Sequence, residues 1–216
     1  MIEFVKPDEI EKRSFEIIRS ELEVCGLSQN ARARLSDPAF ASVIMRVIHT
    51  TADFEYAETL EFSDGAVERA VTALRNGAAV VCDTNMVKAG ADKQRLRAFG
   101  SDIFCFIGDE DVAENARQNG VTRAGAAVDK AVAMGKPVIY AVGNAPTALI
   151  RICELNETKA FAPEFVIGVP VGFVNAAESK ELLIKSGIPH IAARGRKGGS
   201  NVAAAICNAL LRIAAA

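Results

Sequence analysis

The segment AAVVCDTNM, residues 78–86, decides the fold class, because a short apolar run leads directly into polar residues. Helical stretches rich in alanine and charge follow it, such as residues 121–134 and 176–186. Short continuous apolar strands that alternate with helices are typical of a parallel sheet covered on both faces. We therefore predict an α/β protein. Four further runs complete the pattern of five strands, at residues 103–107, 137–142, 165–169 and 188–192.

The first part of the chain has a different pattern. Residues 8–25, with Pro7 expected in the first turn, and the stretch from Pro38 to about His49 carry apolar side chains at helical spacing. Right-handed crossovers between five strands favour a doubly wound parallel sheet of flavodoxin type. We predict a single domain over residues 1–216, in which residues 1–60 add an N-terminal helical layer to an α/β core of residues 61–216.

The composition limits the class of protein. The formal net charge is −2, and Lys and Arg are scattered, which disfavours a nucleic-acid partner. An odd number of cysteines, five, without a Cys-x-x-Cys pair argues against a disulfide framework and a structural zinc site. No run approaches the roughly 20 apolar residues that span a bilayer. We expect a soluble cytoplasmic protein, with no membrane partner and no metal or cofactor.

Polar residues follow most of the predicted strands, and each such segment precedes a helix. In a doubly wound sheet, ligands bind beyond the carboxyl ends of the strands. Helix N-termini present free N–H groups and partial positive charge, so these segments suit an anionic ligand, and Ser200 lies in the last of them. The segments are residues 83–86, 143–147, 170–173 and 194–200.

The known nucleotide-binding and nucleophile-elbow motifs are absent from the sequence, which leaves acid–base chemistry with anion recognition. Such chemistry needs an acid that titrates near neutral pH, which the imidazole of histidine does unaided, and one of the two histidines of the chain is His49. Arg46 lies three positions earlier, so both side chains should project from one helical face. A guanidinium can bind a substrate carboxylate through two hydrogen bonds.

The stretch RVIHTTADFEY, residues 46–56, resembles the precorrin-8X and cobalt-precorrin-8 methylmutases. Together with five further segments, it covers nearly the whole chain in the order expected for that family. The further segments are RSF at 13–15, DTNMV at 83–87, GNAPTAL at 143–149, GVPVGFVNAAESK at 168–180 and GRKGGSN at 195–201.

The resemblance implies an isomerase of cobalamin biosynthesis that shifts a methyl group from carbon 11 to carbon 12 of ring C of a corrinoid tetrapyrrole. It implies a flavodoxin-like homodimer that consumes no cofactor, with His49 as the acid and with Ser14 and Arg46 binding the carboxylate-bearing substrate. We add Arg123 and Ser200 as further candidate contacts to the substrate carboxylates. Arg123 begins a predicted helix, where a cation opposes the helix dipole unless an anion compensates.

Each of these candidate residues also has a simpler structural interpretation. His49 could cap a helix or lie on the surface, Arg46 could be a solvated charge, and Ser14 could bond to its own helix. Asp53 could orient the imidazole or remain a solvated loop carboxylate. For the whole protein, the alternatives are a non-catalytic corrinoid carrier and, from the fold alone, a flavodoxin-type FMN protein.

Overall fold

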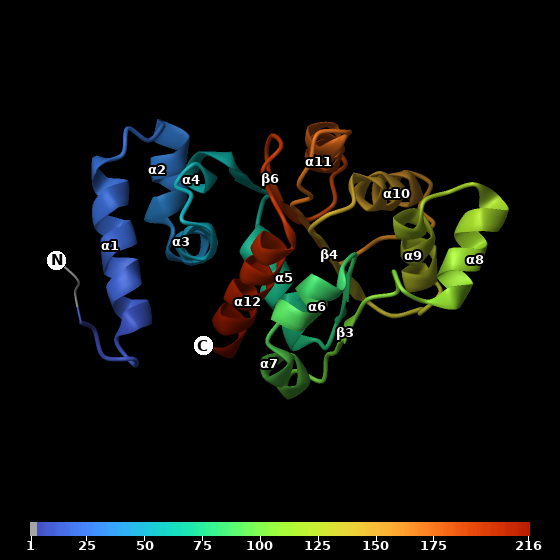
Figure 1. Ribbon diagram of the computed structural model, residues 1–216, viewed down its shortest axis with the longest axis horizontal. Helices are drawn as coiled ribbons and strands as arrows, with labels where there is room; N and C mark the ends of the chain where they lie inside the picture. The colour runs from blue at the N-terminus through green and yellow to red at the C-terminus, as the bar shows by residue number, and fades with distance from the viewer. Residues whose placement is uncertain (1–3) are drawn as a thin grey trace.

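A mixed sheet of six strands runs through the middle of the protein (Figure 1), in a computed structural model that describes residues 4–216. Residues 1–3 of the predicted helical layer therefore lie outside the described residues. The strand order is β1-β6-β5-β4-β2-β3, with β1 antiparallel to β6 and all other pairs parallel. The strands are β1 Leu60–Phe62, β2 Ala79–Cys82, β3 Ile103–Phe104, β4 Val138–Val142, β5 Phe165–Gly168 and β6 His190–Ala193.

The predicted number of strands, five, is wrong. Each predicted run overlaps a strand, although β6 ends one residue after its run, and the edge strand β1 was not expected. Its three residues are too few to show an alternating pattern, and β1 is recognised only by its pairing with β6. The sheet is therefore mixed rather than wholly parallel.

Helices precede the sheet and connect its strands. The described residues contain α1 Ile10–Val24, α2 Gln29–Ser36, α3 Pro38–Thr51, α4 Tyr56–Thr59, α5 Ala66–Arg75, α6 Asn85–Gly90, α7 Lys93–Ala98, α8 Glu110–Asn119, α9 Arg123–Val132, α10 Pro146–Glu157, α11 Ala176–Lys185 and α12 Ser200–Ala215. Among them, no helix is both long enough and apolar enough to cross a membrane.

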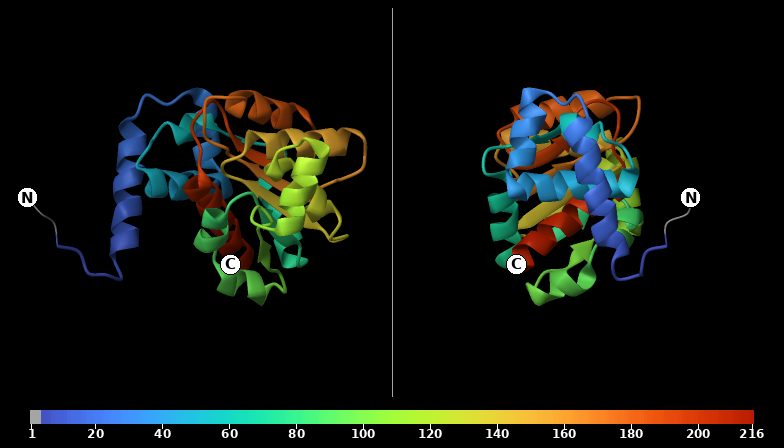
Figure 2. Two further views of the ribbon diagram at one scale, coloured as in Figure 1. Left: turned by 45° about the vertical axis from the view of Figure 1, so that its right-hand side comes forward. Right: turned by 90° about the vertical axis from the view of Figure 1, so that its left-hand side faces the viewer.

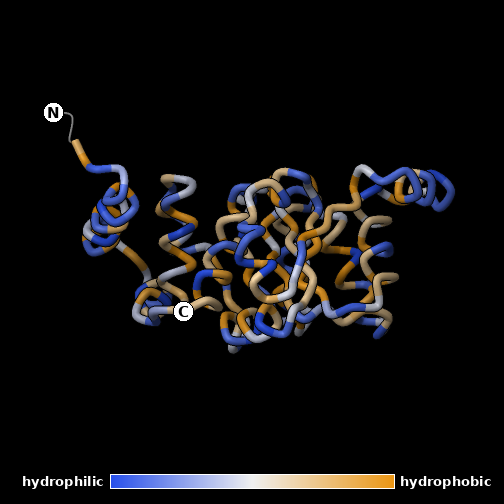
Figure 3. The backbone as a smooth tube through the Cα atoms, turned by 90° about the horizontal axis from the view of Figure 1, so that it is seen from below, coloured by the Kyte–Doolittle hydropathy of each residue, from blue (hydrophilic) through white to orange (hydrophobic). Residues whose placement is uncertain are grey.

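The sheet is buried on both faces, as its continuous apolar strands predict. On the central strand β4, Ile139 and Ala141 pack into one core with α5 and α12. Tyr140 and Val142 point the other way, into a second core with α9, α10 and α11. Figure 3 shows hydrophobic and hydrophilic segments interleaved in the middle of the molecule, and mostly hydrophilic residues on the outlying helix α8. Each fully buried Ile, Leu or Val stabilises the fold by roughly 1.5–3 kcal/mol.

The N-terminal helices form a layer beside the core (Figure 2). α3 packs against α12, and α1 packs against α3 on the outside. α3 begins at Pro38 because the Asp37 carboxylate accepts the backbone N–H groups of Ala39 and Phe40. Its last residue is Thr51, two residues beyond the predicted end at His49. The next residue, Ala52, adopts a left-handed conformation with φ of 53° and ends the helix. Pro7 lies before α1 and not in its first turn.

Candidate functional site

Three side chains from two helices of the N-terminal layer meet at the strongest candidate site. The Phe15 ring of α1 lies 5.3 Å from the His49 ring, centroid to centroid, with the planes tilted by 31°. The Arg46 guanidinium lies 4.8 Å from the centroid of the same Phe15 ring. Arg46 and His49 therefore share one face of α3, and the imidazole is exposed to solvent. This arrangement places an accessible imidazole beside a guanidinium, a group that can bind a carboxylate.

Arg46 already holds a carboxylate, which belongs to the protein itself. Its two terminal nitrogens donate to the two oxygens of Glu11 in α1, at 3.2 and 3.0 Å. Arg212 of α12 binds the same carboxylate at 3.2 and 3.5 Å. The hydrogen bond from Arg46 holds the pKa of Glu11 below its usual value. A substrate carboxylate would have to share Arg46 with Glu11 or displace it.

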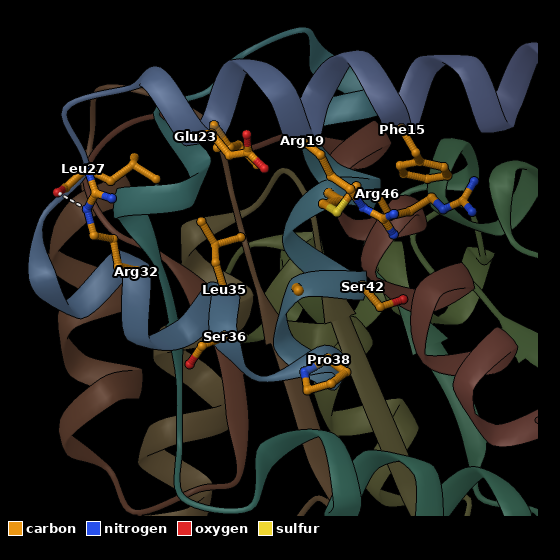
Figure 4. A pocket seen from close by; sticks show the side chains of 13 residues that line it. Phe15, Arg19, Glu23, Leu27, Arg32, Leu35, Ser36, Pro38, Ser42 and Arg46 are labelled. Carbon is orange, nitrogen blue, oxygen red and sulfur yellow. Dashed lines mark hydrogen bonds between the residues drawn. The ribbon is translucent and has the colours of Figure 1, made fainter.

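A groove with a volume of about 620 Å³ adjoins Arg46, between α1, α2 and α3 (Figure 4). Phe15 and Arg46 stand at one end of it, and Leu27 and Arg32 stand at the other. Its walls combine apolar side chains with cations, which suits a ligand that has an apolar body and a carboxylate rim. The lining residues are Phe15, Arg19, Leu22, Glu23, Leu27, Arg32, Leu35, Ser36, Pro38, Ala41, Ser42, Met45 and Arg46.

Ser14 lies next to Phe15 in α1 and is partly buried. Its hydroxyl donates a hydrogen bond to the carbonyl oxygen of Ile10 one turn earlier, at 2.9 Å. This is the usual bond of a serine inside a helix. The hydroxyl oxygen still has lone pairs with which it can accept a bond from a ligand.

The carboxyl edge of the sheet, where the parallel strands end, binds an internal anion. Asp83 follows β2, is 3 % exposed, and accepts the backbone N–H groups of Gly143, Asn144 and Ala145 at 2.9, 2.8 and 2.7 Å. Burial raises the pKa of this carboxyl, and the three N–H bonds oppose that shift. The N–H groups before α10, which we expected to face a ligand, are therefore occupied by Asp83.

Ser200 lies at the same edge and is partly buried. It is the first residue of α12, and its hydroxyl shares a hydrogen bond of 2.8 Å with the hydroxyl of Thr84, the N-cap of α6. Gly143 permits this close approach, because a Cβ there would lie 2.7 Å from the Cα of Ser200. Ser200 thus joins the loops that follow β2, β4 and β6.

Arg123 is exposed at the first position of α9. The preceding Thr122 caps this helix by accepting the N–H of Gly125. α9 and α3 lie toward opposite ends of the molecule (Figures 1 and 2). One chain therefore does not bring Arg123 together with His49.

Asp53 has a partner that we did not expect. Its carboxylate binds the Lys197 ammonium at 2.6 Å, which holds the pKa of Asp53 below its usual value, and α3 ends before reaching it. Asp53 therefore lies in a loop, as its simpler interpretation has it, but its carboxylate is paired with a lysine and only partly solvated. The second histidine, His190, is buried, and its Nδ1 hydrogen-bonds to the carbonyl of Ile188 at 2.7 Å, which fits a packing role.

The sequence reasoning missed two residues that organise these regions. Glu11 was missed because its partners, Arg46 and Arg212, come from distant parts of the chain. Lys180 is completely buried, although lysine is seldom found inside a protein. Its signal was visible, since Ala176, Lys180 and Leu183 have the i, i+4, i+7 spacing of a buried helical stripe.

The fold and the site together define an α/β protein whose helical layer presents a histidine and an arginine beside a groove. The precorrin-8X methylmutase family model matches residues 9–213. The cobalt-precorrin-8 methylmutase of Salmonella typhimurium is 46 % identical over 207 residues, covering 95 % of both chains. That of Leptospira interrogans is 40 % identical, covering 94 % of this chain and 91 % of the relative.

A solved structure leads to the same result. The crystal structure of precorrin-8X methylmutase from Thermus thermophilus matches with a TM-score of 0.83 and 38 % sequence identity, covering 96 % of this chain and 98 % of the other. The chain belongs to the precorrin-8X methylmutase family, which the sequence motifs predicted. It is therefore an isomerase of cobalamin biosynthesis, and the carrier interpretation is not favoured.

Proposed function

We propose that this protein moves the methyl group on carbon 11 of ring C of precorrin-8X, or of cobalt-precorrin-8, to carbon 12. The product would be hydrogenobyrinate or cobyrinate, respectively. The observation that carries the proposal is the exposed imidazole of His49, which lies beside Arg46 in a chain that belongs to the methylmutase family. The names of the relatives supply both candidate substrates.

His49 acts as the general acid in this proposal. Protonation of a ring nitrogen draws electron density from the conjugated macrocycle and favours migration of the methyl group. The migrating group stays within the substrate, and the rearranged ring loses one proton, which restores the imidazolium of His49, so the step requires no oxidant and no second substrate. General acid catalysis by one positioned side chain contributes roughly 10²- to 10⁴-fold to a rate.

Arg46 and Ser14 bind the carboxylated rim of the substrate near the acid, and Ser200 binds it from the sheet. Arg46 is suited to this role because its guanidinium already binds the Glu11 carboxylate through two nitrogens. Entry of a substrate carboxylate at Arg46 would release Glu11, which Arg212 can still hold. This exchange keeps the charges paired throughout binding.

We also propose a homodimer, formed through the outer face of α1. Ile10, Ile17 and Val24 lie seven residues apart on this helix and are 51 %, 39 % and 85 % exposed. An exposed apolar stripe of this kind suits contact with a second copy of this chain. We propose that the two subunits lie side by side and antiparallel, so that α1 of each covers the α9 end of the other, and we assign Arg123 of the partner subunit to the substrate bound at His49 on that basis, because α9 lies far from α3 within one chain.

Subunit mixing tests the dimer and the placement of Arg123 together. His49→Ala and Arg123→Ala proteins, each impaired alone, are unfolded, mixed and refolded. A mixed dimer has one site with an intact His49 and an intact Arg123 of the partner subunit, so activity should return to roughly a quarter of the wild-type value. No recovery in refolded mixed dimers would show that Arg123 does not act across the dimer.

We propose that residues 1–216 form a single domain, with a helical layer at 1–60 and a core at 61–216. The parallel strands have the order β3-β2-β4-β5-β6, which is 2-1-3-4-5 when they alone are numbered, and we classify the core as flavodoxin-like on that basis. Five free cysteines suit the reducing cytoplasm, which is our proposed location.

A spectroscopic assay tests the function. The purified protein is offered metal-free precorrin-8X and cobalt-precorrin-8 in parallel, in stoichiometric amounts, and the visible spectrum is followed with time. An isomerase converts at least one pigment, so its spectrum evolves toward that of the rearranged product. A single immediate shift with both pigments, with no later change, would contradict turnover and indicate a carrier.

A further inference from the structure

One ammonium group in the α/β core has an unusual environment. Lys180 lies in α11, and its side chain is 0 % exposed. Its Nζ donates to the backbone carbonyl of Lys197 at 2.7 Å. Within residues 4–216, the structure gives this ammonium no ion-pair partner, and burial lowers its pKa to about 8. Burial of an unpaired ammonium costs stability that an apolar side chain would not, so the one hydrogen bond of this amine needs an explanation.

The acceptor of this bond lies in the 194–199 loop, between β6 and α12. The loop packs closely on the segment after β5, where the N–H of Gly199 donates to the carbonyl of Val169 at 2.9 Å. A Cβ at Gly198 would lie 2.2 Å from the same carbonyl oxygen, so only glycine fits there. Lys180 therefore holds the middle of a loop whose far end is also fixed.

The side chain of Lys197 points to the helical layer. Its Nζ binds Asp53 at 2.6 Å and Glu55 at 2.8 Å, in the short loop between α3 and α4. That loop begins directly after α3, the helix that carries His49. Lys197 thus connects α11 to the end of α3, through its carbonyl on one side and its ammonium on the other.

We infer that Lys180 is a positioning residue, which holds the 194–199 loop so that Lys197 fixes the end of α3 and, with it, the position of His49 against the substrate. This inference rests on the proposed role of His49. The ion pairs of Lys197 are partly solvated, so they add little to stability. Their importance lies in geometry, because small displacements of a catalytic group lower rates steeply.

The test compares Lys180→Met with Lys197→Met, their combination, and Lys185→Met as an exposed control on the same helix. Methionine keeps the length and apolar stem of Lys180 but removes the donor. We expect kcat to fall about tenfold in either single variant while KM changes less than about threefold. The double variant should be no slower than the slower single variant, because both changes interrupt the same connection.

Hydrogen exchange gives a readout that does not depend on turnover. In Lys180→Met, peptides that cover residues 52–59 should exchange faster than in the wild type, although the hydrogen bond of Lys180 goes to Lys197 and not to that loop. Unchanged exchange there would overturn the connection even if the protein has another activity. Faster exchange with an unchanged kcat would overturn its role in positioning His49. Multiplicative rate losses in the double variant would show that the two lysines act separately.

Discussion

At the carboxyl edge of the sheet, Asp83 is buried and binds three backbone N–H groups, whereas on α3 His49 is exposed and lies beside the Phe15 ring of α1. Both regions are rich in polar groups, yet the polar groups of the sheet edge largely satisfy one another. A polar loop at the end of a strand can therefore serve the fold, while the acid that we propose lies in the layer beside it.

The largest expected effect is a loss of stability when the anion at the sheet edge is removed. Asp83→Ala would leave three backbone N–H groups without their acceptor, and each such loss costs roughly 1–3 kcal/mol. We expect the free energy of unfolding in urea to fall by at least about 4 kcal/mol. Asp64→Ala, at an exposed carboxylate, is the matched control and should change it by less than about 0.5 kcal/mol. A loss below about 1 kcal/mol for Asp83→Ala would contradict the role of this carboxylate in the fold.

On the α3 side, Arg46→Ala should alter activity rather than folding. We expect kcat/KM to fall about 100-fold, because a bidentate carboxylate contact is lost. The free energy of unfolding should change by less than about 1 kcal/mol, since Glu11 keeps Arg212 as a partner. Arg46→Lys should recover little, because an ammonium lacks the planar fork. Equal losses of stability and activity would show that Arg46 is structural, and Arg117→Ala on α8 controls for a lost surface charge.

The pH dependence of the free energy of unfolding tests whether the ammonium of Lys180 is buried in the core. The folded-state pKa of Lys180 is lowered to about 8, so between pH 8 and about 10.5 the unfolded chain binds more protons than the native one. The free energy of unfolding therefore rises with pH across this window, by about 3 kcal/mol. Urea titrations of the wild type and Lys180→Met should converge as the pH rises. Parallel curves from pH 7 to 10.5 would mean that the amine is not held buried.

The smallest effect concerns Ser14. Its hydroxyl already bonds to Ile10, so its contribution to substrate binding is that of one additional acceptor. Ser14→Ala should raise KM about threefold to tenfold with little change in kcat, measured by initial rates. Ser20→Ala, which removes an equivalent helix-bonded hydroxyl from the same helix, should leave KM unchanged.

The two regions also differ in how far the sequence predicts them. Continuous apolar runs locate β2, β4, β5 and β6, because a strand buried on both faces has a local signature. The strand β1 has none, since only its pairing with β6 distinguishes its three residues from a loop.

The candidate site also has some features that the sequence predicts and others that it does not. The spacing of Arg46 and His49 on one helix is a local property, and it predicts their common face. The ion pair between Glu11 and Arg46 and the path from Lys180 to Asp53 join residues that are distant in the chain. No periodicity encodes such pairs, so they emerge only from the packed structure.

One rate measurement tests the central claim, that His49 is the acid. Wild type, His49→Ala and the neighbouring exposed control Thr50→Ala are each mixed in excess with the substrate that the wild type converts, and the spectral change is followed through a single turnover. We predict that His49→Ala binds the pigment with an affinity within about threefold of wild type but rearranges it at least about 100-fold more slowly. A His49→Ala protein that rearranges the bound pigment at a rate close to wild type would contradict the account.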